Sequence, residues 1–167
     1  IINGYTLALA SLLMPVGAIG DRWGRKPILL IGLAVFVGAN LMGALSGSTG
    51  VLLAARLISG VGAAMIMPVT LSVITSSFPP EQRARAVGIW SGFAGGGGIL
   101  GLFVSAWVVD NATWPWVFAL PIVLSAISFV ITIPVVPNSR EHHVGKFDIV
   151  ASVLSVFAIG GLVLGIH

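Results

Sequence analysis

The chain of 167 residues is 57% hydrophobic and only 8% charged. A soluble domain has about 25% charged residues, so this chain lacks the charge needed to cover its surface in water, and a lipid bilayer is the expected solvent. Its net charge of +3 does not indicate a nucleic-acid partner, because seven of the eight basic residues lie in separate short loops between apolar runs.

These apolar runs are each close to the ~20 residues that an α-helix needs to cross ~30 Å of hydrocarbon. They lack the alternation of membrane-barrel strands. Because backbone groups in lipid must pair internally, each run is predicted to be a helix. The predicted fold is therefore an all-α, polytopic transmembrane helix bundle. The runs are 1–20, 27–47, 51–75, 86–109, 115–136 and 149–167.

Lysine and arginine occupy every other loop between these runs. The first, third and fifth loops are basic, whereas the second and fourth contain no Lys or Arg. This positive-inside pattern assigns the three basic loops to the cytoplasm. The chain then begins on the outer side, and since it also starts and stops inside apolar runs, we expect a piece of a longer protein with one helix before it. The basic loop residues are Arg22, Arg25, Lys26, Arg83, Arg85, Arg140 and Lys146.

The first basic loop is a tight charged turn. Gly17 allows the preceding helix to pack closely or to bend, and Gly24 supplies a turn that other residues adopt less readily. Asp21 can pair with Arg22 or Arg25, or it can face the N-terminus of another helix. The simpler role of these charges is to fix the membrane topology of the chain. A second role would be that of a latch that holds one conformation of the protein.

The stretch around this turn, GAIGDRWGRKP, resembles the loop signature of the major facilitator superfamily, G-x-x-x-D-R-x-G-R-K. In that family the loop joins the second and third helices, so the resemblance implies that run 1–20 is helix two. It also implies a charge lock at the cytoplasmic face that biases the alternating-access equilibrium. The matching residues are Gly17, Asp21, Arg22, Gly24, Arg25 and Lys26.

A second stretch, LLAARLISGVGAAMIMP, resembles the fourth-helix signature of the same family. An arginine inside an apolar span costs a few kcal/mol unless it pairs or reaches water, which makes Arg56 a functional candidate. The alternative is that Arg56, only about five residues inside the outer boundary, extends its side chain to the interface. The resemblance implies that Arg56 couples transport to protons. The matching residues are Leu52, Arg56, Gly60, Gly62, Ala63 and Ala64.

The run 86–109 is rich in glycine and lines up with the fifth-helix antiporter pattern that ends in G-P-x-x-G-G. Leu102 stands where that pattern has proline, and this departure leaves the direction of coupling open. Small residues four apart form a flat stripe that another helix can approach closely, and both packing and bending remain open. The glycines of this predicted packing or hinge surface are Gly88, Gly92, Gly96, Gly97 and Gly101.

The stretch TWPWVFALPIVL resembles helix six of the fourteen-helix drug:proton antiporters, although Pro115 replaces the usual arginine. Its tryptophans also suit an interfacial belt in any membrane protein. The short basic loop and FDIVASVL after it resemble the entry to the extra seventh helix of that branch. The predicted organisation is helices two to six at 1–136, a cytoplasmic loop at 137–148 and the start of a further helix at 149–167.

Enzyme chemistry is not indicated by any motif, and no cofactor or metal is expected. His142 and His143 are predicted to be solvated in the fifth loop, and Asp148 is predicted to cap the last helix. We therefore predict a multi-pass protein of the cell membrane that exports small drug-like or cationic compounds in exchange for protons. Its partners would be the substrate, protons, the bilayer and a C-terminal half that packs against this bundle. The alternatives are a family importer or uniporter of sugars or organic acids, and a non-transporting or inactive membrane protein.

Overall fold

The computed structural model describes residues 5, 9–13, 16–17, 20 and 23–137. Four long helices and one short 3₁₀ segment lie within residues 25–137, the described residues at 5, 9–13, 16–17 and 20 are also helical, and the described part of the chain contains no β-strand. The predicted all-α class is confirmed. The elements are α2 (Arg25–Ala44), α3 (Thr49–Ser77), α4 (Pro80–Asn111), η1 (Trp114–Phe118) and α5 (Ala119–Val135).

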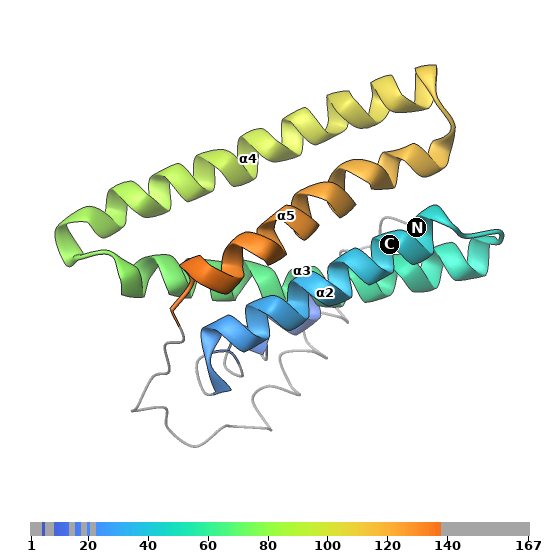
Figure 1. Cartoon of the computed structure of the whole chain (residues 1–167). Helices are drawn as coiled ribbons and strands as arrows, with labels where there is room; N and C mark the ends of the chain where they lie inside the picture. Colours follow the sequence, from blue (N-terminus) through green and yellow to red (C-terminus); the bar gives the residue numbers. More distant parts are fainter. Residues whose placement is uncertain (1–4, 6–8, 14–15, 18–19, 21–22, 138–167) are drawn as a thin grey trace.

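All four long helices are apolar and long enough to cross a membrane, with η1 and α5 together forming one span. They run up and down (Figure 1), so the α3–α4 hairpin lies at the same end as the start of α2 and the end of α5. This end carries Arg25, Lys26, Arg83 and Arg85, and we call it the basic end. The alternation of basic loops in the sequence predicted this grouping.

The third loop is shorter than the sequence indicated. The apolar run was expected to begin at residue 86, but α4 begins at Pro80. Proline fits the first position of a helix because its missing N–H has no helical partner there, and Glu81 in the first turn complements the helix dipole. Hydropathy marks only the lipid-embedded part of a helix, so it misses a polar first turn.

The turn from α3 into α4 is closed by an arginine. Arg83 Nε donates a hydrogen bond of 3.1 Å to the carbonyl oxygen of Phe78, the residue that caps the end of α3. Within the described residues no ion pair joins Glu81 to Arg85, although their spacing would allow one. Arg83 and Arg85, which the sequence placed in the third loop, both lie within α4.

The closest helix packing is between α2 and α3. A buried cluster of Ile28, Leu29 and Leu33 from α2 and Val69 from α3 lies between the two helices. A Cβ on Gly62 would lie 2.9 Å from the backbone nitrogen of Phe36, which is closer than real Cβ contacts. Because Gly62 has no side chain, the backbones of α2 and α3 can approach closely, as is common where small residues lie between membrane helices.

Helix α4 stands apart from this packed pair. None of its 32 residues is buried, and among the described elements it contacts only its chain neighbours, α3 and η1. Nothing described lies within 4 Å of a Cβ built on any glycine of the predicted stripe, which are Gly88, Gly92, Gly96, Gly97 and Gly101. The helix contact expected there stays a prediction.

Several predicted features fall outside the described residues. These are Asp21 and Arg22 of the charged turn, nearly all of the loop 137–148, and the predicted helix at 149–167. The loop histidines, His142 and His143, and the capping Asp148 are among them.

Candidate functional site

Arg56 projects from α3 about two helical turns after Thr49, the first residue of that helix. Its side chain is half-buried. The guanidinium carbon lies 4.8 Å from the centroid of the Phe118 ring, within the range of a cation–π interaction. Glu81 and Asp110 are the acidic residues of the described segments, and neither pairs with Arg56. Among the described residues, the group that stabilises the Arg56 charge is therefore the ring of Phe118.

The ring of Phe118 fits against α2 because a glycine there leaves space for it. A Cβ on Gly43 would lie 2.7 Å from Cε1 of the Phe118 ring, so the ring occupies the space that a side chain would fill. Phe118 is 4% exposed, and Trp114 meets it edge to face with the ring centroids 6.1 Å apart. Gly43, Phe118 and Arg56 therefore form a contact chain that joins α2, η1 and α3.

Sequence reasoning singled out one of these three residues as functional. Arg56 was predicted from its charge within an apolar span. Phe118 was noted only as part of the helix-six resemblance, and Gly43 was missed. The signal for Gly43 was weak, since a glycine near the end of a helix is ordinary and its ring partner lies far along the chain.

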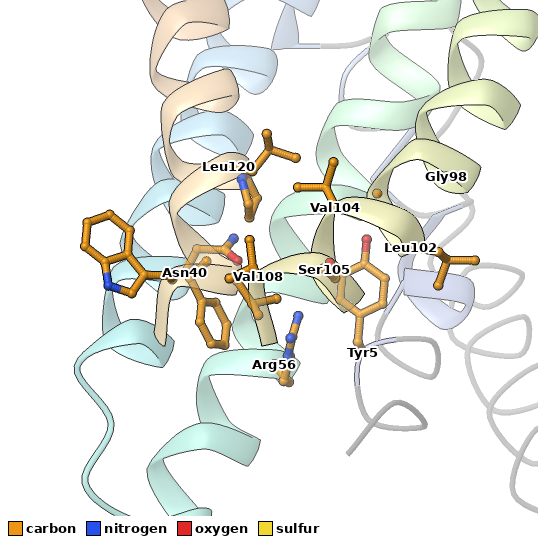
Figure 2. Close-up of a pocket in the computed structure, with 14 residues that line it drawn as sticks. Tyr5, Asn40, Arg56, Gly98, Leu102, Val104, Ser105, Val108 and Leu120 are labelled. Carbon is orange, nitrogen blue, oxygen red and sulfur yellow. The ribbon is translucent and has the colours of Figure 1, made fainter. Parts of the chain in front are cut away.

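Arg56 also lines a pocket of about 510 Å³ between α2, α3, α4 and the η1–α5 segment. Figure 2 shows its side chain reaching from α3 into the space between Asn40 and Tyr5, next to Ser105 and Val108 of α4. Most of the other lining residues are apolar, and none of the described lining residues is acidic. Such a space accepts apolar groups, offers a cation to a hydrogen-bond acceptor or anion, and repels cations at the Arg56 end.

Asn40 is the most buried polar residue of this pocket, with 3% of its surface exposed. Its Nδ2 donates a hydrogen bond of 2.8 Å to the carbonyl oxygen of Phe36 on the same helix. This bond satisfies part of the amide inside the apolar bundle. Asn40 was not singled out from the sequence, because a lone asparagine in an apolar run does not indicate which face it occupies.

The described residues of the charged turn have separate structural tasks. Gly24 has φ 113°, a left-handed value that favours glycine, and its N–H donates to the carbonyl oxygen of Gly20 at 3.1 Å. A Cβ on Gly17 would lie 3.3 Å from Pro68 Cβ of α3, so Gly17 is at a tight contact. Arg25 is 8% exposed. Lys26 Nζ donates a hydrogen bond of 2.6 Å to the carbonyl oxygen of Ile133 near the end of α5.

The fourth-helix signature also has a packing role. Gly60 and Gly62 are both buried on α3, and the close approach to α2 depends on Gly62. Ser59, which stands where the signature often has glutamine, is buried and its Oγ donates to the Arg56 carbonyl oxygen at 2.9 Å.

A family comparison agrees with these motifs. The model described as Major Facilitator Superfamily matches residues 1–166, almost the entire chain. This chain belongs to the major facilitator superfamily. The resemblance inferred from the charged turn and the fourth-helix signature is confirmed, and the protein is a multi-pass integral membrane protein of the cell membrane.

Relatives of this superfamily chain include named efflux and resistance proteins. It is 39% identical to the multidrug efflux pump LfrA of Mycolicibacterium smegmatis over 93% of this chain and 31% of the relative. It is 35% identical to the methylenomycin A resistance protein of Bacillus subtilis over 97% of this chain and 35% of the relative. The tetracenomycin C resistance and export protein of Streptomyces glaucescens is 32% identical over 99% of this chain and 31% of the relative. The chain thus spans about a third of the length of these relatives.

Proposed function

We propose that this chain is the first part of a secondary active transporter that exports small drug-like compounds in exchange for protons. The observation that carries the proposal is the family match over residues 1–166, together with relatives that are named for efflux and resistance. The described helices α2 to α5 would be helices three to six of a bundle that packs against a second half. Membership of a transporter family also supports a protein that is not an enzyme.

Arg56 is the proposed coupling residue. A guanidinium inside an apolar span is costly unless it is compensated, and here the Phe118 ring compensates it at 4.8 Å while no described carboxylate does. A nearby cation favours the ionised form of a carboxylic acid. Arg56 would therefore assist proton release from an acidic side chain contributed by a part of the protein outside this chain.

Substrates with a large apolar surface fit the lining of the pocket beside Arg56 best. Its walls are mainly apolar, and its polar groups are few and come from different elements. Because Arg56 is the one charged residue among the described lining residues, these walls favour neutral or amphipathic compounds. A cationic compound would need an acidic partner from a segment beyond the described residues.

The charged turn is the proposed latch at the cytoplasmic face. Asp21→Asn should depress transport while insertion and expression stay normal, because the substitution removes a charge without removing bulk. The test compares transport rates at matched protein amounts in the membrane. Unchanged rates would remove the latch from the mechanism.

A uniporter or importer of nutrients is the second candidate, and Leu102 in place of the antiporter proline favours it. Proteoliposomes containing the complete protein separate the two functions, with a neutral amphipathic dye as the first substrate and the cationic dye ethidium as the second. Exchange for protons predicts dye movement that a pH gradient drives and an ionophore abolishes. Movement that follows only the dye gradient would support the uniporter, and no movement of any tested compound would support a non-transporting protein.

Arg56 has its own arm in this experiment. Arg56→Gln should abolish gradient-driven movement while dye exchange without a gradient persists. Arg85→Gln removes a cation from the basic end, away from the pocket, and is the matched control. Equal losses in the two variants would contradict a coupling role for Arg56.

A further inference from the structure

We propose that Lys26 caps the C-terminal end of α5 and thereby fixes the charged turn to that helix. Lys26 Nζ donates a hydrogen bond of 2.6 Å to the carbonyl oxygen of Ile133, a residue 107 positions further along the chain. The transport consequence rests on the proposed function, whereas the cap itself does not.

The Ile133 carbonyl needs an outside donor because its own helix cannot supply one. In an α-helix this oxygen would accept from the N–H four residues on, at position 137. That residue is proline, which has no N–H. The N–H of Val136 is directed at Thr132, to whose carbonyl oxygen it donates at 3.2 Å. The last carbonyls of a helix have no partner within the helix, and at this exposed one the Lys26 ammonium takes the place of water as the donor.

The helix dipoles explain why a lysine occupies this position. Lys26 lies in the first turn of α2, where a cation is unfavourable for its own helix. The end of α5 carries the opposite partial charge and lies beside the start of α2, since the two helices pack in opposite directions (Figure 1). The same charge that opposes α2 therefore stabilises the end of α5. An ammonium on a flexible stem suits a single carbonyl oxygen as a point donor.

This contact separates Lys26 from the other charges of the turn. A side chain bound to α5 within the same bundle is committed there and does not have to reach another half of the protein. Lys26 is then a positioning residue and not one of the charges of the proposed latch. The end of α5 and the turn would move together during the transport cycle.

A double-mutant cycle in the complete protein tests the cap. Lys26→Met removes the ammonium, and Lys26→Arg keeps a donor of similar reach. Pro137→Ala restores an N–H at position 137 and lets α5 continue far enough to supply Ile133 itself. The midpoint of thermal unfolding in detergent should fall by roughly 1–2 °C in Lys26→Met. It should fall by less than half of that when Pro137→Ala is present, and it should hardly change in Lys26→Arg.

Arg85→Met is the matched control for charge, because Arg85 is also a cation in the first turns of a helix at the basic end. It should behave identically in both Pro137 backgrounds. Additive effects of Lys26→Met and Pro137→Ala would overturn the cap. If Lys26→Met alone fails to accumulate, recovery of the double variant supports the cap and continued failure overturns it.

Transport measurements distinguish this inference from the proposed function. Lys26→Met should lower the maximal rate with little change in the KM for the dye, and Pro137→Ala should restore the rate. A protein that transports nothing but shows the non-additive unfolding cycle would refute the proposed function and leave the cap standing. A protein that transports the dye but shows additive effects in the unfolding cycle would support the proposed function and refute the cap.

Discussion

Replacing Gly62 by alanine probes the close approach of α2 and α3. The new Cβ would lie 2.9 Å from the Phe36 nitrogen and 3.0 Å from the Gly32 carbonyl oxygen. Both neighbours are backbone atoms, so relief requires the helices to separate. Overpacking of this kind costs about 1–3 kcal/mol, while alanine returns up to ~1 kcal/mol of helix propensity. The expected net loss is about 1–2 kcal/mol.

The assay is thermal unfolding of the complete protein in detergent, where this loss should lower the midpoint by roughly 1–2 °C. Gly38→Ala is the matched control on α2, because nothing described lies within 4 Å of its Cβ position. Propensity alone acts there, so its midpoint should stay level or rise. A Gly62→Ala protein as stable as the Gly38→Ala protein would refute the inference that the α2–α3 approach depends on the missing Cβ.

Three further substitutions test other parts of the structure. Phe118→Leu removes the ring beneath Arg56 and should slow proton-driven transport several-fold more than Trp107→Leu, at an exposed position of α4 outside the pocket lining, does at equal expression; equal effects would contradict a role for the cation–π contact. Gly24→Ala places a side chain at φ 113°, which costs of order 1–3 kcal/mol and should lower the unfolding midpoint; an unchanged midpoint would argue against strain at this turn. Gly96→Ala should leave the midpoint unchanged if α4 has open space there, whereas a drop in the complete protein would reveal the helix contact that the glycine stripe predicts.

The helices were predictable because the requirements of lipid are strict. An apolar run of about 20 residues without alternation has one plausible structure in a bilayer, and each described helix lies on such a run. The ends were less predictable. The run 86–109 marked only the apolar part of α4, which starts at Pro80, because the first turn is polar and extends beyond the apolar segment.

The candidate site was only partly predictable, for a different reason. A charged residue inside an apolar run is easily recognised in a sequence, so Arg56 could be predicted. Its ring partner Phe118 and the space provided by Gly43 depend on how α2, α3 and η1 are placed in three dimensions. The contact from Lys26 to Ile133 joins residues 107 positions apart, and no local pattern could link them. Such contacts require the tertiary arrangement.

The isolation of α4 also bears on how the protein is made. Of the four spans α4 has the lowest mean hydropathy, 1.7, and no residue of it is buried in the described part of the chain. Among the described helices made before it, α4 contacts only α3, so on leaving the translocon it would be surrounded mainly by lipid until later-synthesised segments reach it. A run of glycines is a poor helix former in water, yet in hydrocarbon an unwound backbone would lose its internal pairing. During biogenesis the hydrocarbon of the membrane would therefore keep this helix folded.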